Sequence, residues 1–163
     1  MSEHQRSTQR GPASPWQPPS IAAALPNQPA AFWIAALASL GLIIGGVGPW
    51  ATAYGTVSLS GTSMHGWREV SVGVLGLVML GLHLALRARL ALLVAAIGGA
   101  LGAMQALATL DKIDSGGVVT VFGISYRYQY LDPAWGLYLV LVSAIALALS
   151  ASALAWRVSR AAG

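Results

Sequence analysis

Four long apolar segments without a charged side chain constrain this chain more than any other feature. They are residues 30–50, 70–86, 90–110 and 134–156, and none contains Asp, Glu, Lys or Arg. A helix needs about 20 apolar residues, within a range of about 17–25, to cross the hydrocarbon core of a bilayer. Only 9% of the residues are charged, against about 25% in soluble domains, so a water-facing surface over four such helices is excluded. The sequence therefore predicts an all-α membrane protein, a four-helix transmembrane bundle.

The tryptophans support this count of spans. Five of the six lie near the predicted helix ends, at positions 33, 50, 67, 135 and 156. Trp33 and Trp50 are about 25 Å apart along a helix, and Trp135 and Trp156 about 31 Å, at 1.5 Å per residue. Such separations match aromatic belts at the two membrane interfaces.

The two ends of the chain are polar. Residues 1–29 hold six of the eight prolines among Ser, Gln, Thr and Arg, a composition that predicts a disordered tail. A secretory signal places its apolar core near the start, whereas the first long apolar segment begins at about Ala30, so we expect this helix to be retained. The transmembrane domain is predicted over residues 30–157, and residues 158–163 form a short stub.

The basic residues predict the orientation. Six of the nine lie in the tail, in the turn between the second and third spans, and at the C-terminal end of the chain, where they are Arg157 and Arg160; four of the five acidic residues lie on the opposite side. The positive-inside rule then places both termini in the cytoplasm. The basic residues are scattered and form no nucleic-acid-binding motif, so nucleic acid is not expected as a partner.

The segments predicted on the outer side are residues 51–69 and 111–133. Residues 56–60, 118–122 and 124–130 alternate or are rich in β-branched and aromatic residues between glycines, which predicts strands. Gly123 marks either a tight hairpin turn or a bulge within one bent strand, and Asp132-Pro133 is expected to end the strand pattern. We therefore expect a small extracytoplasmic antiparallel β-sheet of two or three strands. Pairing between the two outer segments would join the two helical hairpins.

The last of these strands carries the candidate interaction surface, which comprises Tyr126, Arg127, Tyr128 and Tyr130. Tyr and Arg are favoured at protein interfaces, so a recognition surface for a protein, a glycan or a lipid headgroup is one interpretation. An aromatic girdle at the membrane interface without a partner is the second, and an unstructured loop is the third.

Small residues recur at helical spacing within the spans. The candidate helix-packing residues are Gly41, Gly45, Ala95, Gly99, Ala103 and Gln105. Small residues allow helix backbones to approach closely, either within the chain or against a second copy or another membrane protein. Gln105 is the one amide within a span, and an interhelical hydrogen bond is its predicted role.

Chemistry-bearing residues are sparse. Ionisable groups at mid-depth, which often mark function in membranes, are essentially missing from the predicted spans. His83 is expected near the cytoplasmic surface rather than in a proton relay. His65 and Glu69, with the outer aspartates Asp111, Asp114 and Asp132, are the one weak pattern for a divalent cation. The chain has no Cys and no nucleotide-binding or hydrolase motif, so we predict no enzyme, no catalytic, cofactor or metal site, and no cofactor.

Four short motifs lie at the ends of the predicted spans and outer segments and carry a resemblance to other proteins. They are Gly48-Pro49-Trp50, Ser60-Gly61, Gly66-Trp67 and Trp135-Gly136-Leu137-Tyr138. In these motifs and in the order of its parts, over about residues 30–156, the chain resembles a group of small uncharacterised four-span membrane proteins of actinobacteria. The resemblance implies a bacterial plasma-membrane location and no known activity. The layout is similar in outline to claudin-like proteins, from which it departs by its short first outer segment and by lacking their paired cysteines.

The function expected from these features is that of a non-enzymatic integral membrane protein. It would be an accessory or scaffold subunit of the cell envelope, acting through helix–helix and extracytoplasmic contacts with another membrane protein or with a second copy of the chain in the lipid bilayer. The alternative is a subunit of a transporter or lipid-handling assembly.

Overall fold

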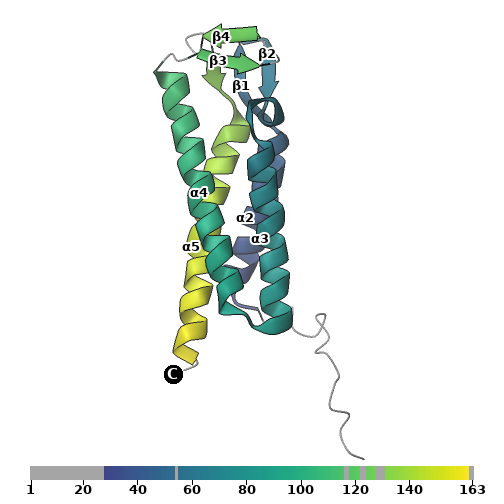
Figure 1. The fold of residues 1–163 in the computed structure, drawn as a ribbon, viewed down its shortest axis with the longest axis vertical. Helices are drawn as coiled ribbons and strands as arrows, with labels where there is room; N and C mark the ends of the chain where they lie inside the picture. Colours follow the sequence, from purple (N-terminus) through teal and green to yellow (C-terminus); the bar gives the residue numbers. More distant parts are fainter. Residues whose placement is uncertain (1–27, 54, 116–117, 122–123, 128–130, 162–163) are drawn as a thin grey trace, which may run out of the picture.

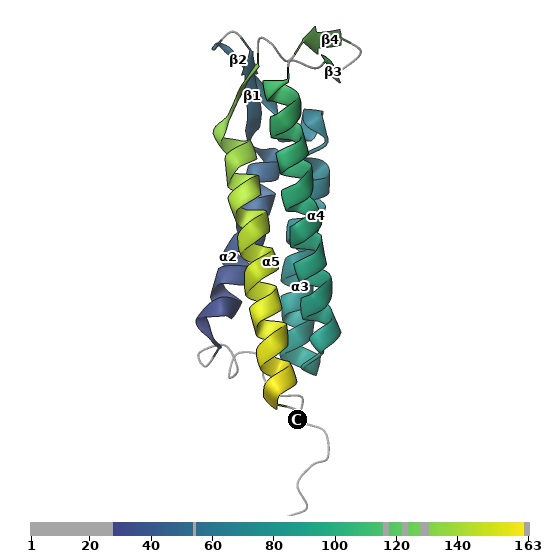
Figure 2. The same cartoon turned by 90° about the vertical axis from the view of Figure 1, so that its left-hand side faces the viewer.

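The computed structural model describes residues 28–53, 55–115, 118–121, 124–127 and 131–161. Four helices lie side by side, and the strands gather at one end of them (Figures 1 and 2). The helices are α2 (Ala30–Val47), α3 (Trp67–Leu86), α4 (Arg89–Asp114) and α5 (Trp135–Ala161). We call the end with the strands the sheet end, and the end with the α3–α4 connection the turn end. The tail predicted over residues 1–29 lies outside the described residues except for its last two.

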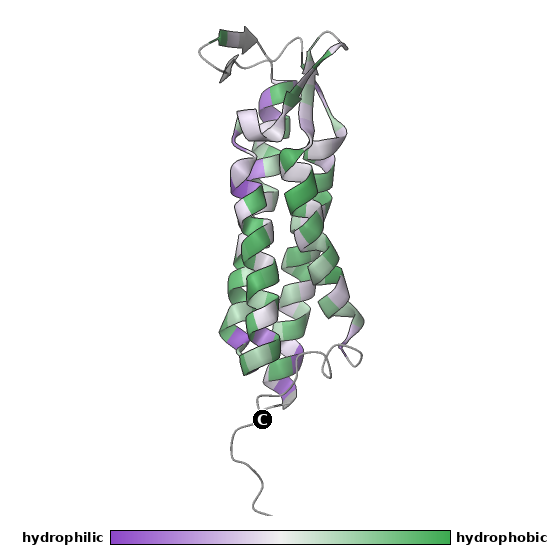
Figure 3. Ribbon diagram, turned by 90° about the vertical axis from the view of Figure 1, so that its right-hand side faces the viewer, coloured by the Kyte–Doolittle hydropathy of each residue, from purple (hydrophilic) through white to green (hydrophobic). Residues whose placement is uncertain are grey.

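All four helices are long enough and apolar enough to cross a membrane, so the predicted four-helix bundle is confirmed by length and composition. Hydrophobic residues fill the middle of the bundle, and hydrophilic ones gather towards its two ends (Figure 3). Large apolar side chains also point outward, including Leu37, Ile97 and Leu149, each at least 59% exposed. An apolar outer surface of this extent is typical of helices that face lipid.

The first helix is shorter than predicted. Helix α2 ends at Val47 rather than at residue 50, and the Gly48 N–H makes the last helical bond, 2.9 Å from the Ile44 carbonyl oxygen. Proline has no N–H to continue the helix, so Pro49 begins strand β1 (Pro49–Ala53) instead. The other helices extend beyond the predicted spans, and α3 begins inside the predicted outer segment 51–69.

Strand β1 is the centre of a three-stranded antiparallel sheet, between β2 (Val57–Ser60) and β5 (Leu131–Pro133). Residues 51–53 pair with residues 131–133, so the predicted pairing between the two outer segments is confirmed. The expectation that Asp132-Pro133 ends the strand pattern is wrong, because Thr52 pairs with Asp132. Proline is tolerated there since β5 is an edge strand.

A separate hairpin follows α4. Strands β3 (Val118–Val121) and β4 (Ile124–Arg127) pair antiparallel with Val121 opposite Ile124. The tight hairpin is therefore the correct alternative, and the single bent strand is wrong. The pair forms its own two-stranded sheet and does not extend the sheet around β1.

Small residues bring the helices together within the chain. A Cβ atom added at Gly45 of α2 would lie 3.0 Å from the Gly136 carbonyl oxygen of α5, and one at Gly99 of α4 would lie 2.7 Å from the Ala148 nitrogen of α5. Ala95 is buried in the core, and Ala103 packs against it. Helix α5 thus packs against both α2 and α4.

Helix α3 packs on α2 through glycines that the sequence analysis did not select. A Cβ at Gly73 would lie 2.5 Å from the Ser39 carbonyl oxygen, and one at Gly46 would lie 2.9 Å from the Gly66 carbonyl oxygen. This contact determines which face of α3 points into the bundle.

Candidate functional site

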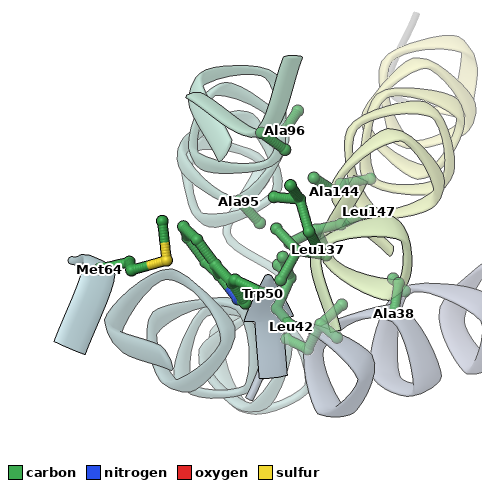
Figure 4. Packing of buried hydrophobic residues seen from close by; sticks show 14 of the residues in the cluster. Ala38, Leu42, Trp50, Met64, Ala95, Ala96, Leu137, Ala144 and Leu147 are labelled. Atoms are coloured by element: carbon green, nitrogen blue, oxygen red, sulfur yellow. The ribbon is translucent and has the colours of Figure 1, made fainter. Parts of the chain in front are cut away.

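Trp50 closes the sheet end of the bundle. Its side chain is fully buried, and its indole N–H donates a hydrogen bond to the Gly45 carbonyl oxygen at 2.9 Å. The ring lies between Met64 and Leu137, close to Leu42 (Figure 4). The prediction that Trp50 belongs to an aromatic belt is wrong, because strand β1 turns this side chain into the core.

Two glycines make room for the indole and the chain around it. A Cβ at Gly61 would collide with Trp50 Nε1 and with the Gly46 carbonyl oxygen, and a Cβ at Gly66 would lie 2.5 Å from that same oxygen. The Gly61 N–H donates to the Gly48 carbonyl at 2.7 Å, and the Gly66 N–H to the Gly61 carbonyl at 2.6 Å. These bonds hold the short helix η2 (Gly61–Met64) against the end of α2.

The start of α5 completes the same junction. The Ala134 N–H donates to the Trp50 carbonyl oxygen at 2.9 Å, a Cβ at Gly136 would lie 2.5 Å from the Pro49 carbonyl oxygen, and one at Gly48 would meet the Trp135 ring at 2.9 Å. The four short motifs of the sequence therefore meet in one place. We call this set, residues 48–50, 60–61, 66–67 and 135–136, the Trp50 junction. It fixes the strands to the helices.

Glu69 is the one buried acidic residue among those that the structure describes. It is the third residue of α3, its side chain is 1% exposed, and its Oε2 atom has no hydrogen-bond partner in the described part of the chain. Taking an ionised carboxylate out of water costs several kcal/mol even after the protein relaxes. An acidic side chain in this position is therefore a strong candidate for function.

The carboxyl group lies against α4 and α5. A Cβ added at Gly102 would lie 2.7 Å from Glu69 Oε2 and 3.5 Å from the Ala144 Cβ. Ala144 is nine residues beyond Trp135 in α5, about 13 Å along the helix. The carboxyl group thus lies well inside the apolar part of the bundle.

Glu69 belongs to a set of buried polar side chains that each rest on a glycine of a neighbouring helix. Ser39 Oγ of α2 is 2.5 Å from a Cβ position at Gly76, and Ser143 Oγ of α5 lies against Gly41. The Ser39 hydroxyl donates to the Ala35 carbonyl at 2.9 Å, within its own helix. Glu69 Oε2 lacks such a partner in the described part of the chain, which distinguishes Glu69 from Ser39.

The sequence analysis counted Glu69 in the outer segment 51–69 and grouped it with the outer aspartates, whereas the structure makes it the third residue of α3 and buries its side chain. The buried residues of α3 are Glu69, Gly73, Gly76 and Leu80. They recur at intervals of four, three and four, so they share one helix face. The sequence does contain a signal for this burial: Glu69 shares a helix face with Gly73 and Gly76, which pack against α2.

The weak pattern for a divalent cation is not assembled. His65 is exposed and ends η2 in the left-handed region at φ 74°, whereas Glu69 points into the bundle. Asp111, Asp114 and Asp132 are exposed. Among the residues described by the structure, no group of three His, Asp or Glu residues is placed to hold a metal ion.

The remaining predicted residues lie apart from Glu69. Tyr126 and Arg127 are in strand β4, whereas Tyr128 and Tyr130 fall outside the described residues, so the tyrosine surface stays a prediction. His83 is at the turn end, where its Nδ1 is 3.4 Å from the Ala88 carbonyl oxygen. Gln105 accepts a hydrogen bond from the Thr109 hydroxyl at its backbone carbonyl, 2.9 Å away. In the described part of the chain, its amide makes no interhelical bond.

Comparison with known proteins gives no relative to set beside this site. No protein-family model, no curated protein and no solved structure matches the chain.

Proposed function

We propose that this chain is a non-enzymatic, multi-pass protein of the bacterial plasma membrane that acts as an accessory or scaffold subunit through its contacts. The observation that carries the proposal is the Trp50 junction, which joins the three-stranded sheet to the end of α2 and to the starts of α3 and α5. Backbone hydrogen bonds at Gly61, Gly66 and Ala134 fix this sheet to the bundle. A small sheet held in this way can present a constant surface to a partner.

The sheet end also offers groups that a partner can bind. Val57 on β2 and Ile124 on β4 are 56% and 59% exposed. Strand β2 lies at the edge of its sheet, and an edge strand presents backbone groups to which another strand can add. The partner we propose is another membrane protein or a second copy of this chain, embedded in the same bilayer.

The proposed orientation places the sheet end outside the cytoplasm and both termini inside it. Single cysteines at Ser58 and Ser115, both exposed, are expected to react with a membrane-impermeant maleimide in intact cells. A cysteine at Ser7 is expected to react only after the cells are opened. The native chain has no Cys, so it serves as the blank. If only the Ser7→Cys variant were labelled in intact cells, the orientation would be the opposite of the one proposed.

The proposed function is tested by crosslinking and mass spectrometry after purification in a mild detergent. We expect the wild-type chain to carry a stoichiometric partner whose crosslinks map to the sheet end. Ile124→Ser, and separately the triple variant Tyr126→Ala, Tyr128→Ala and Tyr130→Ala, should weaken that partner by at least about tenfold, which corresponds to 1.4 kcal/mol.

The matched control is Val142→Ala, in α5, where the side chain is 64% exposed on the outer surface of the bundle. It should retain the partner. A folded wild-type chain that is monomeric and free of protein partners in its native membrane would contradict the proposal.

A second candidate is a subunit of a transporter or lipid-handling assembly, and the observation that favours it is the buried Glu69. Ionisable side chains inside membranes commonly mark pathways for ions and protons. Glu69→Gln is expected to leave the partner bound in either case. A scaffold would then keep the activity of its assembly, whereas a transport subunit would lose it.

A further inference from the structure

We propose that Glu69 is a reversible proton-binding site inside the helical bundle, protonated in the packed arrangement of the structure and deprotonated when the first turn of α3 separates from α4 and α5. The proposal goes beyond a scaffold function, because it assigns a chemical event to the interior of the bundle. It stands on the burial of Glu69, on its neighbours, and on its place in α3.

The surroundings of the carboxyl group favour a proton over a metal ion. The carboxyl group lies against Gly102 of α4, and the same Cβ position at Gly102 is 3.5 Å from the Ala144 Cβ of α5; neither residue offers a side-chain ligand. A divalent cation such as calcium takes six to eight oxygen ligands, and no group of three candidate ligands exists in the part of the chain that the structure describes. A proton needs only the one oxygen that is already present.

The charged group that acts on Glu69 in the described structure is its chain neighbour Arg68. Helix α2 contains no ionisable residue, and the neighbours His65 and Arg68 are exposed, with the Arg68 guanidinium 6.0 Å from the centroid of the Trp67 ring. Tyr138, near the start of α5, is 50% exposed. The other ionisable groups of the helices and their caps lie at the helix ends: His83, Arg87, Arg89, Asp111, Lys112, Asp114, Arg157 and Arg160. Arg68 thus acts on Glu69 only as an exposed neighbouring charge, and Glu69 Oε2 has no hydrogen-bond partner in the described structure.

The position of Glu69 gives the proton a route to water. Only Trp67 and Arg68 precede it in α3, and both are exposed at the sheet end. If the first turn of α3 lifts from the bundle, the carboxyl group reaches water, which accepts the proton and hydrates the carboxylate that remains. The return of the turn requires the proton to bind again.

This motion would act on the Trp50 junction. Gly66 immediately precedes α3, its N–H donates to the Gly61 carbonyl at 2.6 Å, and its carbonyl accepts a hydrogen bond from the Val70 N–H at 3.1 Å. Proton release at Glu69 is therefore coupled to the contact between η2 and α3. The contacts at the sheet end would therefore change with the protonation of Glu69, although its carboxyl group is not one of them.

The test is infrared spectroscopy of the purified full-length chain in lipid vesicles of phosphatidylcholine and phosphatidylglycerol. At neutral pH we expect the carbonyl stretching band of a protonated carboxylic acid. It should be lost completely in Glu69→Gln and retained in the matched control Asp111→Asn, whose exposed carboxyl is at the sheet end of α4. The band should decrease as the pH is raised and return when the pH is lowered again.

A second readout locates the acid independently. Dicyclohexylcarbodiimide, an apolar reagent that adds to protonated carboxyl groups, is expected to modify Glu69 in preference to the exposed aspartates, as peptide mass spectrometry would show.

Two results would overturn the proposal. One is a folded wild-type chain that lacks the band at neutral pH, because its carboxyl is then ionised. The other is a band that stays constant until the chain unfolds, because the proton is then not exchanged.

Discussion

Trp50→Ala is expected to lower the free energy of unfolding by about 3–5 kcal/mol, the range for removing a large buried aromatic side chain. The side chain is fully buried, and its N–H satisfies the Gly45 carbonyl at the end of α2. Its loss leaves a cavity bordered by Met64 and Leu137 (Figure 4) and removes the group on which Gly61 packs. The measurement is reversible unfolding in detergent micelles titrated with sodium dodecyl sulfate.

Two further variants separate the causes. Trp50→Phe keeps most of the apolar volume and loses the hydrogen bond, which is worth about 1 kcal/mol, so it should fall between the wild type and the alanine variant. Trp156→Ala is the control, because that side chain is 61% exposed and the Arg160 guanidinium lies 4.1 Å from its ring centroid. It should cost at most about 1 kcal/mol. Equal losses for Trp50→Ala and Trp156→Ala would refute the buried junction.

The second large effect is expected at Gly99, where α4 and α5 are closest. An added Cβ would lie 2.7 Å from the Ala148 nitrogen and 2.8 Å from the Ala144 carbonyl oxygen. Both are backbone atoms, so neither helix can yield by rotating a side chain. Gly99→Ala is therefore expected to lose about 2–3 kcal/mol of stability, at the upper end of the range for overpacking. The same titration in detergent micelles measures it.

The adjacent glycine provides the control. A Cβ at Gly98 meets only Val72 Cγ1, at the ordinary distance of 3.4 Å. Alanine is favoured over glycine in a helix by up to about 1 kcal/mol, so Gly98→Ala should leave the stability unchanged or raise it. The two variants add the same methyl group one residue apart and are expected to differ in sign. A stabilising effect at both positions would show that α4 and α5 are not in backbone contact at Gly99.

The tertiary structure also decided which of the small residues matter. The predicted Gly41, Gly45 and Gly99 do contact a neighbouring helix. Gly73 and Gly76 in α3 were not selected, although they lie against Ser39 of α2. Spacing shows that a glycine stripe exists, but it does not show which neighbouring helix faces the stripe, because that depends on the rotation of each helix.

Local sequence signals failed at Gly48-Pro49-Trp50. An apolar run with a tryptophan at its end predicts a helix that reaches the membrane interface. Proline ended the helix before residue 50, and the next residues paired with β5, about 80 residues later in the chain. This pairing turns the Trp50 side chain into the core instead of towards the membrane interface. The local sequence of the segment does not predict it, because the partner strand lies far away in the chain.

The sequence by itself determined the class of this protein, because four uncharged apolar segments exceed what a chain with 9% charged residues can shield from water. It also determined the presence of strands, since alternation and β-branching are local properties. Only the tertiary structure decided that Trp50 closes the bundle and that Glu69 points into it. Both depend on which helix face meets which neighbour, and that is set by close packing among α2, α3, α4 and α5 rather than by any one segment.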